Sequence, residues 1–301
     1  MRDAADTYLA LSDREAENFI ALIHSHSGIK LDQDKKSLIS SRLLKRLRAL
    51  GIESFKHYFD YLQTAEGKNH ELSEMIDEIT TNKTSFFREN HHFDYMTKTY
   101  LPTLLERHRF PWKIEINVWS AGCATGEEPY TLAMVLADFV EAARGGTFAI
   151  LGTDISTQAL LRARQAVYER HLIDTVPPAY REKYLMCGKG KQAGNYRVVP
   201  ELRDRVTFQY MNFVEPYWDI PQHPDIIFCR NVMIYFDKPT RQQMIRKFHE
   251  RLGPDGLLFI GHSETLNDLN HSFVPVMPTV YRRIAEERRT SGGNRRRSGD
   301  G

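Results

Sequence analysis

The chain has few cysteines and no long apolar run. These absences indicate which cellular compartment the protein occupies and whether it enters a membrane. Only three of the 301 residues are cysteine, and Cys123, Cys187 and Cys229 show no C-x-x-C spacing. Because three cysteines cannot all pair, we expect a reduced, cytoplasmic protein. No apolar run approaches the roughly 18 to 20 residues that span a bilayer, and the charged N-terminus fits no signal peptide. The sequence predicts a globular protein without membrane insertion.

Metal-binding patterns and a strong overall charge are missing as well. The twelve histidines form no H-E-x-x-H pattern and no Cys/His zinc spacing, so no resident metal is expected. The formal charge of +2 comes from residues 286–301, which carry five arginines against three acids. Basic and acidic residues balance in the rest, so no nucleic acid partner is expected. The segment 286–301 is predicted to be a disordered basic tail. The segment Gly261–Thr265 lacks the second glycine of a hydrolase nucleophile elbow, which favours a structural or solvated role.

The most informative segment is 118–130, Val-Trp-Ser-Ala-Gly-Cys-Ala-Thr-Gly-Glu-Glu-Pro-Tyr. An apolar strand at 114–119 leads into it, and residues with helical spacing follow it. A strand, a glycine turn and a helix form the nucleotide-binding corner of a doubly wound α/β sheet. Gly122 and Gly126 let the backbone pass close to a ligand, although their spacing is neither G-x-G-x-x-G nor a P-loop.

Charges at this corner select among cofactors. A free helix N-terminus attracts phosphate, whereas Glu127 and Glu128 place negative charge there and would repel a pyrophosphate. Asp154 ends a second strand, 147–153, where such folds bind ribose hydroxyls. An ordinary turn or N-cap role for Asp154 is the alternative, which the nearby glycine loop disfavours. We therefore expect a sulfonium nucleoside without phosphate, S-adenosylmethionine (SAM), with the product S-adenosylhomocysteine.

The N-terminal residues 12 to about 80 show helical spacing and no clear strand. Helices are predicted at 12–26, 34–50, 55–63 and 72–79. The second helix carries an apolar stripe and, on another side, a basic face. A charged face is usually only solvated, but a face of a single sign calls for an acidic partner. Its residues are Lys35, Arg42, Lys45 and Arg46.

Further strands and helices extend the α/β pattern toward the C-terminus. A helix is predicted from about 91 to 107, and another over 241–252. Strands are predicted at 206–211, 225–229, 257–260 and 280–284, and the apolar run 225–229 is typical of a buried parallel strand. Arg230 and Asn231 follow that strand at its carboxyl end, where open α/β sheets bind ligands. Between residues 168 and 206, a small antiparallel insertion is predicted from the segments 184–186 and 196–199.

Four of these segments resemble the chemotaxis-receptor glutamate methyltransferases, the CheR family. They are Thr-Asn-Lys-Thr-Ser-Phe-Phe-Arg at 81–88, the glycine loop at 120–130, Thr-Asp-Ile at 153–155 and Phe-Cys-Arg-Asn-Val-Met-Ile-Tyr-Phe-Asp at 228–237. The resemblance covers about residues 12–284. It implies an α/β fold: a doubly wound SAM-dependent methyltransferase sheet with a small inserted antiparallel β-subdomain, preceded by an all-α N-terminal domain. The expected boundaries are 1–82 for the helical domain with its basic recognition helix, 83–110 for a linker helix, 111–285 for the SAM-binding domain with its insertion at 172–205, and 286–301 for the tail.

The resemblance also implies an activity, methyl transfer from SAM to glutamate side chains of bacterial chemotaxis receptors for sensory adaptation. A glutamate carboxylate is already ionised at neutral pH, so the transfer needs no general base and rests on alignment and exclusion of water. Arg88 and Tyr235 are implied to align the reactants, and the basic face of the second helix to bind the receptor. For contact with the cofactor, Glu127 is the alternative to Glu128. The implied cofactor-binding positions are Asn82, Thr84, Arg88, Gly122, Glu128, Asp154, Asn212, Phe213, Arg230 and Asn231.

The implied partners are the cytoplasmic helices of a methyl-accepting receptor. In some members of the family the β-subdomain also docks on a receptor C-terminal peptide, and a purely structural insertion is the alternative. A catalytically silent SAM-binding regulatory module is an alternative function, which turnover with a receptor fragment would separate. A nucleic-acid methyltransferase is disfavoured by the neutral body and by the lack of an Asn-Pro-Pro-Tyr-like strand end. The sequence does not specify which receptor or which glutamates are modified.

Overall fold

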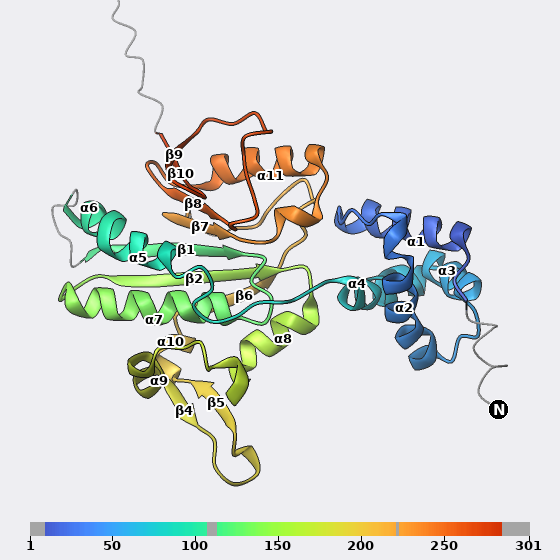
Figure 1. Cartoon of the computed structure of the whole chain (residues 1–301), viewed down its shortest axis with the longest axis horizontal. Helices are drawn as coiled ribbons and strands as arrows, with labels where there is room; N and C mark the ends of the chain where they lie inside the picture. Colours follow the sequence, from blue (N-terminus) through green and yellow to red (C-terminus); the bar gives the residue numbers. More distant parts are fainter. Residues whose placement is uncertain (1–9, 107–112, 221–222, 285–301) are drawn as a thin grey trace, which may run out of the picture.

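The computed structural model describes residues 10–106, 113–220 and 223–284. Within these residues the chain forms a helical lobe, a seven-stranded sheet with helices on both faces, and a separate three-stranded sheet (Figure 1). The expected α/β architecture with an all-α N-terminal domain is confirmed. The predicted C-terminal tail at 286–301 lies outside the described residues.

The helical lobe consists of the four predicted helices. They are α1 (Asp13–Ser27), α2 (Lys36–Leu50), α3 (Phe55–Gln63) and α4 (Leu72–Ile79), with a 3₁₀ turn at Gln33–Lys35 and a π turn at Gly67–Glu71. Ser12 and Glu15 form a capping box that starts α1, and Gly28 ends it with a φ of +73°. The apolar faces enclose a core around Phe19, Leu43 and Tyr58.

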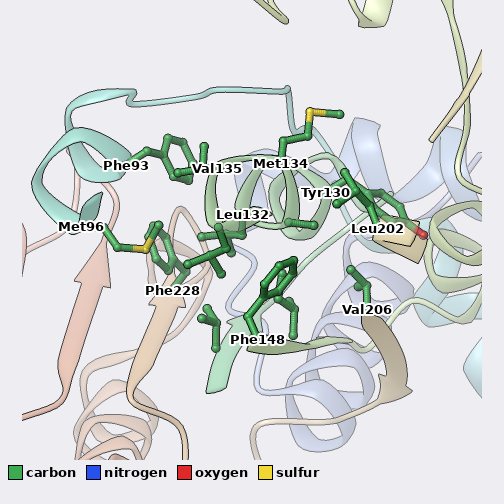
Figure 2. Close-up of a cluster of buried hydrophobic side chains, with 14 of the residues drawn as sticks. Phe93, Met96, Tyr130, Leu132, Met134, Val135, Phe148, Leu202, Val206 and Phe228 are labelled. Atoms are coloured by element: carbon green, nitrogen blue, oxygen red, sulfur yellow. The ribbon is translucent and has the colours of Figure 1, made fainter. Parts of the chain in front are cut away.

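A connecting segment, residues 80–90, leads from the lobe to helices that pack on the sheet. These are α5 (His91–Tyr95), a π turn at Met96–Tyr100 and α6 (Leu101–Glu106). The single helix predicted from about 91 to 107 is therefore interrupted by the π turn, and its last residue lies outside the described residues. Figure 2 shows Phe93 and Met96 from this region beside the helix α7 (Glu127–Ala142).

The large sheet has the strand order β6-β2-β1-β7-β8-β10-β9. Five strands are mutually parallel: β1 (Glu115–Ala121), β2 (Thr147–Asp154), β6 (Val206–Tyr210), β7 (Ile226–Cys229) and β8 (Leu257–Ile260). β10 (Val280–Arg283) and β9 (Phe273–Met277) complete the sheet as antiparallel strands. Because the five parallel strands point the same way, their carboxyl ends meet at one edge, which we call the carboxyl edge. The sequence did not predict β9, since Pro275 interrupts it and proline is tolerated only at an edge.

Helices cover both faces of the large sheet, so that β7 and β8 are buried throughout. On one face, α7 and the 91–106 helices pack over side chains such as Phe148 and Phe228 (Figure 2). On the other face, α11 (Lys238–Arg251) packs on a cluster that includes Trp119, Trp218 and Phe248. α8 (Thr157–Gln165) lies beside β2 and β6 and also contacts α4 of the lobe.

The predicted insertion is a three-stranded antiparallel sheet in the order β3-β5-β4. Its strands are β3 (Val167–Glu169), β4 (Leu185–Cys187) and β5 (Asn195–Val198), with the short helices α9 (Pro178–Tyr184) and α10 (Pro200–Arg203) beside them. Because β3 pairs with β5, this subdomain begins at Val167, before the expected boundary at 172. A three-residue strand carries too little periodicity to be recognised from the sequence.

Candidate functional site

The helical lobe is fastened to the carboxyl edge of the sheet by contacts far apart in sequence. Asn212 Nδ2 donates a hydrogen bond to the His26 carbonyl at 2.6 Å, and the Lys30 amide donates to the Tyr235 carbonyl at 2.8 Å. Ile29 forms an antiparallel bridge with Phe236. These contacts close one side of the carboxyl edge with the lobe, so both domains contribute to any site there (Figure 1).

The glycine loop after β1 is held in place by β2. The amides of Gly122 and Cys123 both donate to the Thr153 carbonyl, at 2.8 and 2.9 Å. Asp154 Oδ2 accepts from the Ala124 amide at 2.8 Å, and Oδ1 accepts from the Ser156 amide at 2.9 Å. The loop is therefore fixed by the protein itself, which lowers the ordering cost of binding a ligand.

Gly122 has no room for a side chain. Its φ is +83°, in the left-handed region, and a Cβ built there would lie 2.4 Å from Val232 Cγ2. The loop after β1 and the loop after β7 thus approach within contact distance at this glycine. This close approach forms a narrow cradle at Gly122, and contact of Gly122 with a cofactor stays a prediction.

The two acids of the glycine loop have different surroundings. Glu128 Oε1 accepts from Ser120 Oγ, and Oε2 accepts from Arg230 Nε, each at 2.7 Å. Glu127 Oε2 accepts from Thr125 Oγ1 at 2.7 Å, and burial raises the pKa of Glu127. The charge of Glu128 is therefore compensated by a buried cation, whereas that of Glu127 is not. The choice between the two for cofactor contact remains a prediction.

Arg230 is a buried link between the two sides of the site. Its Nη1 donates to the Arg88 carbonyl at 2.5 Å, and its guanidinium lies over the rings of Phe93 and Phe228. With its side chain enclosed in this way, the implied contact of Arg230 with a cofactor would have to come from its backbone. The Arg230 side chain instead holds the backbone of Arg88 through the hydrogen bond to its carbonyl.

His92 beside Arg230 is held in its neutral form. Its Nδ1 lies 3.4 Å from Arg230 Nη1, and its Nε2 lies 2.8 Å from Thr279 Oγ1. Since a guanidinium only donates, Nδ1 accepts and Nε2 carries the proton. Burial and the charge of Arg230 lower the pKa of His92 to about 3.

Arg88 and Tyr235 lie at the carboxyl edge with part of their side chains open to solvent. Arg88 is one-third exposed, and Tyr235 is 37% exposed. The residues on either side of Arg88, Phe87 and Glu89, have φ values of +54° and +55°. Such left-handed backbone at non-glycine residues is uncommon and persists only where surrounding contacts impose it. The Phe87 amide donates to Thr131 Oγ1 on α7 at 3.2 Å.

The remaining predicted cofactor positions fall into two groups. Asn82 Nδ2 donates to Ser156 Oγ at 3.2 Å, which places it beside Asp154. Asn231 lies in the loop after β7 and has a φ of +60°. Thr84 is half-buried in the connecting segment. In contrast, the side-chain amide of Asn212 donates its hydrogen bond to His26 of the lobe. Phe213 is buried in the aromatic cluster around Trp119, Trp218 and Phe248.

Two of the four residues predicted for the basic face, Arg42 and Arg46, already have partners within the lobe. Arg42 donates to the carbonyls of Glu78, Ile79 and Thr80 and so caps the C-terminus of α4. Arg46 pairs with Glu71 at 2.7 Å and with Glu74 at 3.2 Å. A helical wheel shows which residues share a face, but not whether a neighbouring helix supplies their acids.

The other two residues of that face are open. Lys35 and Lys45 have side chains 51% and 67% exposed, with exposed pairs to Asp34 and Glu78. Exposed pairs of this kind contribute little and exchange readily with other partners. A receptor-binding role for the face therefore stays a prediction, and it now rests on these two lysines.

Glu264 is a residue of the site that sequence reasoning missed. Its buried carboxylate accepts hydrogen bonds from four backbone amides, those of Gly261, Asn231, Val232 and Met233. The available signal was a glutamate four residues after the end of a buried strand. That signal is weak, because the partners are amides that every sequence possesses.

Within the described residues, the structure contains neither a metal-binding cluster nor a membrane-spanning helix. No group of three or more His, Cys, Asp or Glu side chains there could hold a metal ion. In the same ranges, no helix has the length and apolar character needed to cross a bilayer.

The donor set of the carboxyl edge fits SAM. Asp154 keeps a carboxylate whose oxygens each have one backbone partner and a further lone pair for a hydroxyl. Two acids stand in the first turn of α7, where a phosphate would otherwise bind. Acidic groups beside a narrow glycine cradle suit a cationic nucleoside better than a dinucleotide.

Comparisons with known proteins match both parts of the chain. The family model for the CheR methyltransferase all-alpha domain matches residues 14–80, and the model for the CheR methyltransferase SAM binding domain matches residues 82–282. The chain is 40% identical over 273 residues to the chemotaxis protein methyltransferase of Salmonella typhimurium, covering 91% of each chain. It is 39% identical over 270 residues to that of Borreliella burgdorferi, covering 89% of this chain and 94% of the relative. Among solved structures, a magnesium protoporphyrin IX methyltransferase from Synechocystis with bound SAM covers 74% of this chain and 91% of its own, with a TM-score of 0.31 and 11% identity.

Proposed function

The chain belongs to the CheR methyltransferase family, and we propose that the carboxyl edge of its sheet aligns SAM with a receptor glutamate. The activity is SAM-dependent methylation of chemotaxis receptors, with glutamate side chains as acceptors. The observation that carries the proposed site is the arrangement of Asp154, the glycine loop and Arg88 around one edge, closed on one side by the helical lobe.

SAM supplies an electrophilic methyl group on a sulfonium. The acceptor carboxylate is already ionised, so none of the proposed residues has to remove a proton. Their work is to orient two reactants and exclude water, which gives a large part of the rate in such transfers. The fixed glycine loop is suited to orienting the cofactor, and the lobe, which closes one side of the carboxyl edge, is suited to excluding water.

Asp154 is the proposed partner of the ribose hydroxyls. Its position is set by the Ala124 and Ser156 amides, so the carboxylate is in place before binding. Asn82 lies next to it through Ser156, and Thr84 continues the same segment toward Arg88. The glycine loop and Asn231 would contact the rest of the nucleoside through their backbone.

Arg88 and Tyr235 are the proposed aligning residues. Arg88 brings a partly exposed cation to the edge, which attracts an acceptor carboxylate. Tyr235 brings a phenol hydroxyl, and its carbonyl is bonded to Lys30 of the lobe. The position of Tyr235 therefore depends on how the lobe sits on the sheet.

Receptor contact is proposed at two surfaces. Lys35 and Lys45 on the lobe would meet acidic side chains of the receptor's helical methylation region. On the β-subdomain, β4 is an edge strand with Met186 41% exposed. A receptor C-terminal peptide would add to such an edge as a further strand; a purely structural subdomain is the alternative.

The test is methyl transfer from labelled SAM to bacterial membranes that contain receptors. We expect alkali-labile methyl groups on the receptor band. Arg88→Ala and Tyr235→Phe should lower turnover more than they raise the SAM dissociation constant, with some binding loss for Arg88. Wild-type turnover in Tyr235→Phe would remove Tyr235 from the mechanism. SAM binding without any labelled receptor would favour the silent regulatory module.

A further inference from the structure

A short turn after β8 contacts both sides of the proposed site. The turn comprises residues 261–264 and closes with the Glu264 amide donating to the Gly261 carbonyl at 2.9 Å. Because β8 is the next strand to β7, the turn lies at the carboxyl edge, beside the loop that carries Asn231 and Tyr235. The proposed alignment by Arg88 and Tyr235 involves no residue of this turn.

One arm of the turn is the carboxylate of Glu264. Its Oε2 accepts from the Asn231 amide at 2.9 Å, and its Oε1 accepts from the amides of Val232 and Met233 at 3.0 and 2.8 Å. Three consecutive amides thus converge on one buried carboxylate, in a loop whose first residue has a φ of +60°. Charge-assisted bonds of this kind are about twice as strong as neutral ones. Glu264 therefore imposes the backbone shape that leads from Asn231 to Tyr235.

The other arm of the turn is His262. Its Nδ1 lies 2.8 Å from Glu89 Oε1, and its backbone amide donates to the same oxygen at 3.3 Å. The second oxygen, Oε2, is buried and takes no hydrogen bond from the described residues. Arg88, His92 and Arg230 approach this carboxylate only to 4.0, 3.5 and 4.0 Å. His262 therefore supplies the hydrogen bonds to Glu89, the residue that immediately follows Arg88.

The charge state of this pair fits a donating His262. Burial raises the pKa of Glu89, but the hydrogen bonds from His262 and the charge of Arg230 outweigh it and hold the pKa below its usual range. Glu89 is thus an ionised carboxylate that only accepts, so the Nδ1 of His262 carries the proton.

Resting on the proposed function, we propose that His262 and Glu264 are positioning residues for methyl transfer. Through Glu89, His262 holds the left-handed residue that follows Arg88, in addition to the Arg230 bond to the Arg88 carbonyl. Through three amides, Glu264 holds the loop that presents Tyr235. One turn thereby fixes the distance between the two aligning side chains. His262 is 64% exposed, so stabilising the core is a poor explanation for its bond to a buried carboxylate.

The test compares His262→Ala with His262→Asn in the full chain, on membranes that contain receptors. The asparagine amide nitrogen can take the place of Nδ1, whereas alanine leaves only the backbone donor. We expect His262→Ala to lower kcat about ten-fold, as small misplacements of aligned groups do, at nearly unchanged melting temperature and SAM affinity. His262→Asn should restore most of the loss. His223→Ala is the matched control, because its exposed ring makes a bond of the same 2.8 Å length to the Arg251 carbonyl at the opposite end of β7.

Hydrogen exchange separates the two arms. His262→Ala should speed exchange of the 85–90 amides, and Glu264→Gln should speed exchange of the 231–235 amides. Wild-type kcat in His262→Ala, or an equal loss in His262→Asn, would overturn the role of His262. Unchanged exchange at 231–235 in Glu264→Gln would overturn that of Glu264. Absence of any transfer by the wild-type protein would instead count against the proposed function, while the exchange results would still judge the turn.

Discussion

Arg46 on α2 gives the sharpest test of what the basic face does. Its side chain is 17% exposed and lies 2.7 Å from Glu71, whose side chain is 4% exposed. Glu71 also accepts a hydrogen bond from the Tyr58 hydroxyl at 2.7 Å. Replacing Arg46 with alanine therefore leaves a buried carboxylate with one neutral partner.

The cost follows from this geometry. Removing one partner of a buried ion pair costs about 3 to 5 kcal/mol. The Tyr58 hydrogen bond remains, so we expect Arg46→Ala to cost about 3 kcal/mol, the lower end of this range. Lys45 lies on the same helix as Arg46 and pairs with Glu78 of α4 at the surface. Lys45→Ala should therefore cost less than about 1 kcal/mol. The two variants remove the same charge from the same face, so only burial distinguishes them.

Hydrogen exchange of the lobe measures this difference. The amides of α2 and α4 should exchange roughly 100-fold faster in Arg46→Ala, since about 1.4 kcal/mol corresponds to a factor of ten. Lys45→Ala should exchange nearly as the wild type does. If the two variants exchange alike, Arg46 is only a solvated charge and the structural role assigned to it is wrong.

Three further predictions concern the site and its surroundings. Asp154→Ala should weaken SAM binding by about 1 to 3 kcal/mol in calorimetry, through lost ribose bonds and a looser glycine loop; unchanged affinity would remove Asp154 from the site. Because the folded state keeps His92 neutral while the unfolded chain protonates near pH 6.5, stability is complete above that pH and is lost as the pH falls toward about 3. Urea unfolding should thus show a loss of about 2 kcal/mol between pH 6.5 and 5 that His92→Gln lacks; equal pH dependence in both proteins would contradict it. Lys35→Glu with Lys45→Glu should lower receptor methylation and its salt sensitivity while SAM affinity stays unchanged; wild-type methylation in low salt would show a face that is only solvated.

Much of the fold was predictable because its signals are local. The strands β1, β2, β6, β7 and β8 are apolar runs bounded by turn residues. The four lobe helices carry apolar stripes, with serine N-caps at α1 and α3 and glycine at the ends of α1 and α2. The strands that escaped are β3, with three residues, and β9, with a proline at its centre. Both segments form strands only by pairing with other strands, and the sequence of one segment does not show which strand it pairs with.

The residues of the candidate site also divide into those with a local sequence signal and those that depend on distant partners. The glycine loop and Asp154 could be predicted because glycines and acids at a strand end have a direct chemical meaning. The pairing of Glu128 with Arg230 could not, since 102 positions separate them, and neither could the convergence of backbone amides on Glu264. Arg42 and Arg46 show that the sequence predicts a helical face correctly but does not reveal their partners on α4 and at Glu71.

The position of Glu264 in the chain has a consequence for the order of folding. During synthesis, β1, β2 and the glycine loop emerge well before residues 261–264, and the loop after β7 emerges about 30 positions earlier than its carboxylate partner. Until the Glu264 carboxylate is in place, the amides of Asn231, Val232 and Met233 lack their acceptor. The left-handed conformation of Asn231 then lacks the hydrogen bond from its own amide. Such long-range contacts form late, because closing the intervening chain costs entropy before the contact returns it. The edge that joins the two aligning residues is therefore completed at the end of folding, after the sheet on which it stands.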